Sequence, residues 1–229
     1  MKQFTFTERK TYDPLPDGRA LVYFNEVEAT ETDTHEDGSE ETRTVWRYSW
    51  TIAENASREA IISALVRVRY SADDELALSR QKDAKIAEFN AYNAYAEWCK
   101  AYAKRILEGD TIEVAKALKI AELKAYDASD AVNSFSIDGK QQPWIAPDER
   151  ANFLNTIQGE RRIGGTTVNF QGITLPLDIA ENILDRINRY ARQCWEQTEY
   201  HKAAINALTS IEAVDEYDFT QGYPEKLNF

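Results

Sequence analysis

Two cysteines and two histidines are the side chains of this 229-residue chain most able to act as nucleophiles, bases or metal ligands. Cys99 and Cys194 lie far apart in the sequence, each among residues typical of helices. A zinc site of cysteines and histidines would need nearly all four residues together, and none of the usual short spacings is present. The number and spacing of the cysteines also argue against a disulfide framework. We therefore expect no metal site, and both cysteines to be small buried hydrophobic residues.

Catalysis by a histidine would have to use His201, because His35 lies in a polar, acidic stretch. His201 shares the apolar face of a predicted long helix with Cys194. As a general base it would need a hydrogen-bonding partner and a substrate pocket. A core histidine bonded to a backbone carbonyl needs neither, and we expect His201 to be one. The sequence therefore predicts no catalytic residue and no cofactor.

Carboxylates are abundant, since 39 acidic side chains outnumber 27 basic ones and give a formal charge of −12. Two carboxylates about 5–10 Å apart can hydrolyse a glycoside, but so many acids always provide some pair. The acidic balance argues against nucleic acid as a partner, because phosphate binding needs a basic surface. No run of about 20 apolar residues predicts a membrane-spanning helix, and residues 1–10 lack the apolar centre of a signal peptide. We expect a soluble globular protein made in the cytosol.

The N-terminal residues 1–56 have a pattern typical of β-strands. Trp46, Tyr48 and Trp50 alternate with polar residues, as in a half-buried strand. Upstream, an apolar run at residues 21–24 is followed by a polar stretch that contains the turn signal Asp37-Gly38. The pattern predicts a long, solvated hairpin.

From residue 57 the apolar period becomes helical. Ser57 is the predicted N-cap of a helix that ends at Tyr70, and Ser71 that of a second helix that continues to about Leu107. Gly109 ends this segment. The join Gly109-Asp110 is the predicted boundary between an N-terminal domain, residues 1–109, and a C-terminal domain, residues 110–229.

An aromatic stripe recurs every three or four residues along the second predicted helix. Such a stripe can bind a sugar or a partner helix, or it can be a packed seam between helices. If it is exposed, its members are candidate partner-binding residues. They are Tyr92, Tyr95, Trp98 and Tyr102.

The C-terminal domain is predicted to be mostly helical, with short hairpins. A capping pair, Asp110 with Glu113, opens its first helix, Pro147 starts another and Ser210 caps the last. The aromatic end of the chain is expected to pack back on this domain. The remaining predicted elements are short β-like pieces over residues 132–145, a hairpin at 166–175 and the longest helix at 177–208. The predicted fold class is therefore α+β, mostly helical, with an N-terminal β-hairpin, long helices and a helical C-terminal domain carrying short β-hairpins.

An ordered set of residues in the C-terminal half carries a family resemblance. The set comprises Tyr126, Val132-Asn133-Ser134-Phe135, Trp144, Arg150, Tyr190-Ala191, Cys194, Thr198, His201, Ile205, Leu208, Glu212-Ala213-Val214, Tyr217-Asp218 and Gly222-Tyr223-Pro224-Glu225-Lys226-Leu227. In this pattern, residues 111–229 resemble a domain of unknown function that recurs in bacteriophage and prophage genes of gut bacteria of the Bacteroides type. Residues 69–78 are similar to a stretch that often precedes that domain.

The resemblance implies a non-enzymatic phage structural protein, associated with a tail, baseplate or fibre. Its expected partners are other virion proteins and further copies of itself, in a particle assembled in the host cytoplasm. Two alternatives stay open. A tail-fibre assembly chaperone would suit the strong acidity, which keeps a transient binder soluble. A tail-associated glycan hydrolase would need a carboxylate pair, and a chain of this length without repeated β-coils is small for one.

Overall fold

The computed structural model describes residues 3–35, 37, 39–82, 85–170 and 172–229, and the chain divides into two compact units. Unit 1 comprises residues 1–77 and 95–118, and unit 2 comprises residues 78–94 and 119–229. The predicted division into domains 1–109 and 110–229 stays a prediction.

Helices make up about 50% of the chain and strands 23%, so the protein is a mostly helical α+β protein, as predicted. In chain order the elements are β1 (Phe4–Phe6), β2 (Tyr12–Pro14), β3 (Ala20–Thr34), β4 (Glu40–Ala53), α1 (Arg58–Arg67), α2 (Ala72–Arg80), α3 (Ile86–Glu108), α4 (Ile112–Asp127), β5 (Phe135–Ile137), β6 (Lys140–Gln142), α5 (Pro147–Arg162), β7 (Thr167–Phe170), β8 (Ile173–Pro176), α6 (Leu177–Ala207) and α7 (Ile211–Glu216).

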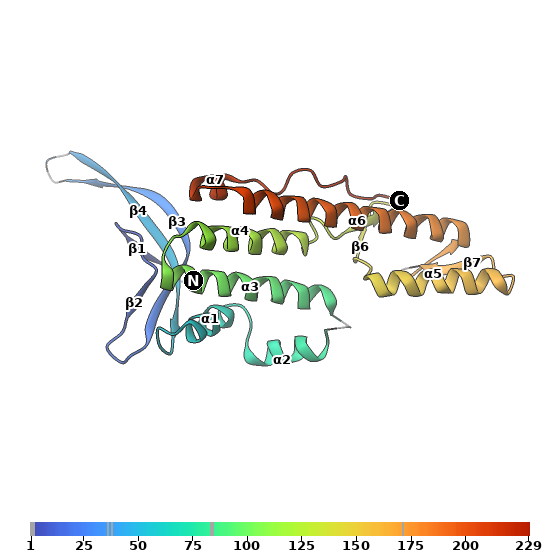
Figure 1. Cartoon of the computed structure of the whole chain (residues 1–229), viewed down its shortest axis with the longest axis horizontal. Coiled ribbons are helices and arrows are strands. Elements are labelled where there is room, and N and C mark those ends of the chain that lie inside the picture. The colour runs from blue at the N-terminus through green and yellow to red at the C-terminus, as the bar shows by residue number, and fades with distance from the viewer. Residues whose placement is uncertain (1–2, 36, 38, 83–84, 171) are drawn as a thin grey trace. The chain divides into compact units, whose positions relative to one another are not determined.

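The sheet of unit 1 is antiparallel, with strand order β1-β4-β3-β2. Strands β3 and β4 pair from Ala20 with Ala53 to Thr34 with Glu40, which confirms the predicted long hairpin. The predicted turn residue Gly38 lies outside the described residues. Strand β1 pairs with residues 46–48 and β2 with residues 20–22, so the hairpin extends beyond both of them as a two-stranded ribbon (Figure 1).

The helices of unit 1 follow the predicted caps with two corrections. Ser57 is the N-cap of α1, and its Oγ accepts from the Ala60 N–H at 3.3 Å. The predicted continuous helix from Ser71 to about Leu107 is wrong, because α2 ends at Arg80 and α3 begins at Ile86. Ser79 to Lys82 is a polar run without the apolar spacing that a packed helix needs.

The second correction concerns the start of α4. Asp110 was expected to cap this helix, but its carboxylate is bound by Arg105, with Nε 2.5 Å from Oδ1. The Thr111 hydroxyl instead accepts from the Val114 N–H at 3.3 Å. A side-chain oxygen in front of a helix satisfies an N–H group that has no partner within the helix. Thr111, not Asp110, therefore caps α4.

The core of unit 2 forms around α6, whose predicted buried face is confirmed. Strands β5, β7 and helix α5 supply the residues opposite it. The α6 side chains that are at most 8% exposed are Leu177, Ala180, Ile183, Leu184, Ile187, Tyr190, Cys194, Thr198, His201 and Ile205. Ser210 caps α7 as predicted, with Oγ accepting from the Ala213 N–H at 3.2 Å.

The C-terminal segment returns along α6 (Figure 1), as predicted. It pairs with β5, since the Ser136 N–H donates to the Leu227 carbonyl and the Phe229 N–H donates to the Ser136 carbonyl, each at 2.9 Å. Lys226 Nζ donates to the Asp130 carbonyl at 2.6 Å. These bonds fix the end of the chain as part of unit 2.

Candidate binding surfaces and polar networks

Three members of the predicted aromatic stripe lie together in unit 1. Trp98 stacks on Tyr95 at 5.8 Å between ring centroids and on Tyr102 at 4.8 Å. Tyr95 Oη donates to the Leu65 carbonyl of α1 at 2.9 Å, and Tyr102 is only 5% exposed. Of the two interpretations, the packed seam describes these three residues better, because their rings and one hydroxyl are used within unit 1.

Tyr92, the fourth member, belongs to unit 2. Its ring lies 6.5 Å from that of Phe89, one turn earlier on α3. The stripe is therefore continuous in sequence but divided between the two units. Partner binding by Tyr92, Tyr95, Trp98 or Tyr102 stays a prediction.

A second aromatic cluster lies on one face of the sheet in unit 1; the strand pattern identified Tyr48 and Trp50, but not their association with the other rings. Neighbouring rings in it are 5.1–6.1 Å apart between centroids, and its members are Phe4, Phe6, Tyr23, Tyr48 and Trp50. The opposite face packs on α1, where Thr51 Oγ1 donates to the Ala64 carbonyl at 3.4 Å. Tyr48 is fully buried, whereas Phe4 is 39% exposed. The cluster thus combines a buried centre with an open edge.

A β-bulge interrupts this sheet beside the cluster. Phe24 pairs with Ser49 and Val27 with Arg47, so Asn25 and Glu26 together lie opposite Tyr48. Bulges re-aim side chains and occur often near functional sites. Asn25 takes a left-handed backbone conformation, φ 52°, which asparagine tolerates better than most residues.

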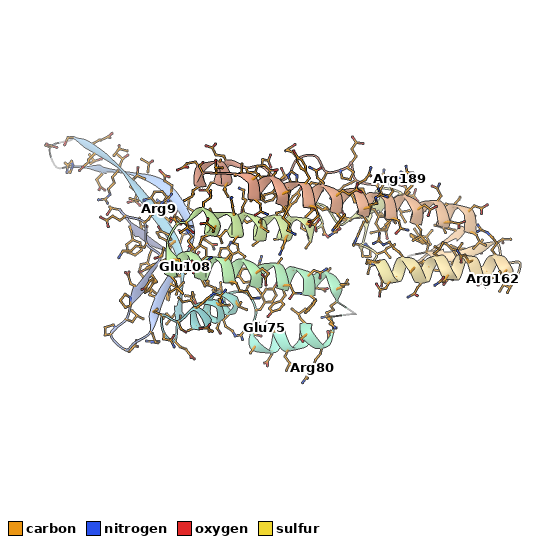
Figure 2. The ribbon with its side chains drawn as sticks, viewed as in Figure 1. Arg9, Glu75, Arg80, Glu108, Arg162 and Arg189 are labelled. Atoms are coloured by element: carbon orange, nitrogen blue, oxygen red, sulfur yellow. The ribbon has the colours of Figure 1, made fainter. Side chains whose placement is uncertain are left out.

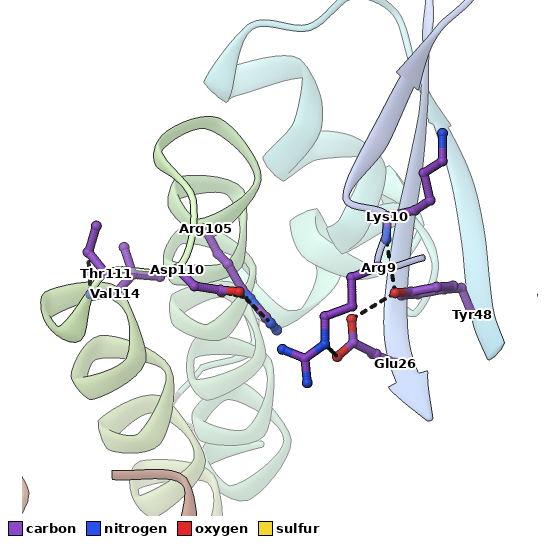
Figure 3. A network of polar contacts seen from close by, with 8 residues as sticks. All are labelled: Arg9, Lys10, Glu26, Tyr48, Arg105, Asp110, Thr111 and Val114. Atoms are coloured by element: carbon purple, nitrogen blue, oxygen red, sulfur yellow. Dashed lines mark hydrogen bonds and ion pairs between the residues drawn. The ribbon is translucent and has the colours of Figure 1, made fainter. Parts of the chain in front are cut away.

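The bulge brings Glu26 to the centre of a polar network (Figure 3). Its Oε2 accepts from the Tyr48 hydroxyl at 2.8 Å, and its Oε1 lies 3.3 Å from Arg9 Nε. The Tyr48 oxygen also accepts from the Lys10 N–H at 3.0 Å. Burial raises the pKa of Tyr48 to about 12, and the bond to Glu26 acts in the same direction. Tyr48 therefore stays protonated and holds the N-terminal segment to the sheet.

A second tyrosine–carboxylate pair lies on the same sheet. Tyr23 Oη donates to Asp13 Oδ2 at 2.8 Å, and Lys10 Nζ donates to Oδ1 at 3.0 Å. Partial burial acts to raise the pKa of Asp13, but these bonds outweigh it and the pKa lies below its usual range. The carboxylate is ionised, and each of its oxygens binds a neighbouring side chain, so this pair joins β2 to β3.

A buried polar network in unit 2 contains His201, which is 3% exposed. Its Nε2 lies 2.8 Å from the Gln221 carbonyl and its Nδ1 2.8 Å from the Tyr217 hydroxyl. The Gln221 carbonyl accepts only, so Nε2 donates to it, and the side chain of Gln197 lies 2.9 Å from the same nitrogen. His201 is a core histidine bonded to a backbone carbonyl, as predicted.

Two further side chains extend this network. Thr198 Oγ1 donates to Asp127 Oδ1 at 2.8 Å and lies 2.8 Å from the Tyr223 hydroxyl. The Thr198 hydroxyl has one proton, which it donates to Asp127, so the Tyr223 hydroxyl donates to Thr198. Burial raises the pKa of Asp127, although the bond from Thr198 acts against it. Each of these groups binds α4 or the C-terminal segment to α6.

Within the described residues, no cluster of three or more His, Cys, Asp or Glu side chains is arranged to hold a metal ion. None of the helices in that part of the chain combines the length and apolarity needed to cross a membrane. Comparisons with protein-family models, with curated proteins and with solved structures gave no match.

The two cysteines are free and buried, as predicted. Burial raises the pKa of the Cys99 thiol to about 12 and that of Cys194 to about 11. Thiolates, not thiols, are the nucleophilic and metal-binding form. Both thiols are therefore expected to be protonated near neutral pH, which agrees with buried packing residues.

Proposed function

We propose that the protein is a non-enzymatic structural component of a bacteriophage particle, associated with its tail, baseplate or fibre. It acts by binding other virion proteins, and it self-associates in the particle. The phage setting is taken from the resemblance of residues 111–229. The binding role is supported above all by the ribbon of unit 1, defined as Thr30–Thr34 of β3 and Glu40–Thr44 of β4.

The ribbon has the features of a strand pair that lacks a partner. Its side chains project on both sides (Figure 2), and nearly all of them are exposed. Its side-chain contacts lie within the hairpin β3–β4: Thr32 Oγ1 is 3.3 Å from Thr42 Oγ1, Arg43 is 3.2 Å from Asp33, and Glu31 accepts from Arg47 at 3.4 Å. Among the described strands, none pairs with its outer edges.

An isolated two-stranded hairpin is marginally stable in water, and unpaired strand edges readily accept another strand. The ribbon nevertheless carries strand-forming threonines along its length. This combination suits a surface that becomes ordered against another protein of the particle. The partly exposed aromatic cluster beside it extends the same surface.

Quantitative mass spectrometry of gradient-purified particles, beside the crude lysate, tests this function. A fixed ratio to the capsid or tail proteins supports a structural component. Abundance in the lysate without incorporation overturns it and favours the assembly chaperone. Release of reducing ends from host capsule by the purified protein would favour the glycan hydrolase.

A shortened variant tests the ribbon itself. Residues 30–44 are replaced by an Asn-Gly turn that joins Ala29 to Val45, two residues that are paired in the sheet. We expect the variant to fold, because the paired core of the sheet is retained, and to be missing from the particle. Incorporation of this variant at the normal ratio would place the contact elsewhere on the chain.

A further inference from the structure

Arg150 of α5 is a buried cation without an anion. Its side chain lies in unit 2, where the residue is 9% exposed, and its buried Nε has no hydrogen-bond partner. Among the described residues, none forms an ion pair with it or accepts a hydrogen bond from its guanidinium. Its side-chain contact is with the ring of Trp144, whose centroid lies 5.7 Å from the guanidinium carbon.

This arrangement is costly in three ways. A charge that is largely buried without an anion loses hydration that no ion pair replaces, and burial accordingly lowers the pKa of Arg150. An Nε–H group that is buried without an acceptor adds a second cost. The third cost is electrostatic, because Arg150 lies in the first turns of α5, where the helix dipole disfavours positive charge.

Two exposed arginines of unit 2 have carboxylate partners. Arg161, on the same helix, lies 2.7 Å from Asp178 and 2.8 Å from Glu181. Arg192 lies 2.8 Å from Glu196 on α6. Arg150 is the one buried arginine among the described residues, and it has no carboxylate partner in a chain with an excess of acids. The nearby carboxylate of Glu149 accepts from the Ala146 N–H instead.

We propose that Arg150 and the ring of Trp144 form a binding site for an oxyanion, either a carboxylate or a phosphate group. The guanidinium presents parallel N–H groups that match two oxygens of such an anion. The indole ring of Trp144 packs beside the guanidinium. One bound oxyanion removes all three costs: it neutralises the charge, accepts hydrogen bonds and suits the positive end of α5. The site is independent of the function proposed above.

Thermal unfolding of the full chain in sodium acetate and in sodium phosphate, each against sodium chloride of equal ionic strength, tests the site. A ligand that binds only the folded state raises the midpoint with its concentration. We expect a midpoint that rises with acetate or phosphate and not with chloride. A response to acetate alone identifies a carboxylate site, and a response to phosphate alone a phosphate site.

Arg150→Met separates binding from packing. Methionine keeps the apolar length of the side chain and removes the charge, so we expect a midpoint in chloride at least as high as that of the wild type, and no response to either anion. Arg161→Met is the matched control on the same helix and should keep the response. Arg150→Lys retains the charge but not the planar fork, and we expect anion affinity to fall about tenfold.

Three results would overturn the site. The first is a wild-type midpoint that neither anion raises. The second is loss of the response in Arg161→Met, which would reveal general screening of charge. The third is an anion response that persists in Arg150→Met. If Arg150→Met does not fold, the test uses Arg150→Lys together with the NMR signal of the wild-type Arg150 Nε–H, which must shift on titration with the anion.

Discussion

The two polar networks of this protein use the same residue types, tyrosines with a carboxylate and a basic side chain, in opposite surroundings. In unit 2, His201 is 3% exposed and both ring nitrogens have partners. In unit 1, Glu26 is 16% and Arg9 56% exposed at the side chain. Buried polar groups are costly to unpair, whereas exposed ion pairs contribute little. We therefore expect the network around His201 to contribute more to stability than the outer ion pair of Arg9 with Glu26, although Tyr48 in unit 1 is itself buried.

The largest expected effect comes from breaking the buried network. His201→Ala leaves a cavity, removes the partner of the Tyr217 hydroxyl and leaves the Gln221 carbonyl with Gln197 as its remaining donor. We expect the free energy of unfolding to fall by about 2–4 kcal/mol, measured by urea denaturation. The control is Trp195→Ala on the same helix, where a side chain that is 63% exposed should cost no more than about 0.5 kcal/mol. Equal losses in the two variants would contradict the large contribution of the buried network to stability.

A smaller effect is expected at the bulge of unit 1. Asn25→Ala keeps the left-handed conformation but loses the tolerance of asparagine for it, so we expect a loss of about 1 kcal/mol. Asn25→Gly is the matched control, because glycine takes positive φ without strain, and it should stay within about 0.5 kcal/mol of the wild type. Urea denaturation of both variants measures the difference. If alanine and glycine behave alike, backbone conformation does not hold Glu26 in place.

Local patterns predicted most of the fold. The alternation of Trp46, Tyr48 and Trp50 identified β4, and the caps Ser57 and Ser210 and the first-turn Pro147 marked three helix starts. Each of these signals depends on residues that are only a few positions apart in the sequence. The apolar face of α6 was equally clear, because its length gave the period many repeats.

The candidate sites were less predictable, because they depend on pairing between distant segments. The bulge at Asn25 and Glu26 arises from the register of β3 against β4, and only the tolerance of Asn25 for positive φ hinted at it. The unpaired state of Arg150 depends on which carboxylates the fold brings near it. The stripe from Tyr92 to Tyr102 was recognised, but its period is the same for a seam and for an open surface.

The smallest expected effect is a pH dependence at Asp127, which sharpens the contrast because it belongs to the buried network. Burial raises the pKa of this carboxyl, so the folded state binds the proton more tightly than the unfolded chain. Keeping Asp127 ionised therefore costs free energy at neutral pH, and that cost is relieved as the pH falls through the folded pKa. Asp127→Asn removes the titration and keeps an oxygen for the Thr198 hydroxyl. In urea denaturation between about pH 7 and about pH 4, the variant should be the more stable protein at the upper end, and its advantage should shrink on acidification.

The control with the opposite sign is Asp218→Asn. Bonds from Thr220 lower the pKa of Asp218, so the wild type should be more stable than this variant near neutral pH, and that advantage should fade as the pH falls. A constant difference between wild type and Asp127→Asn across the range would mean that burial does not raise the pKa of Asp127.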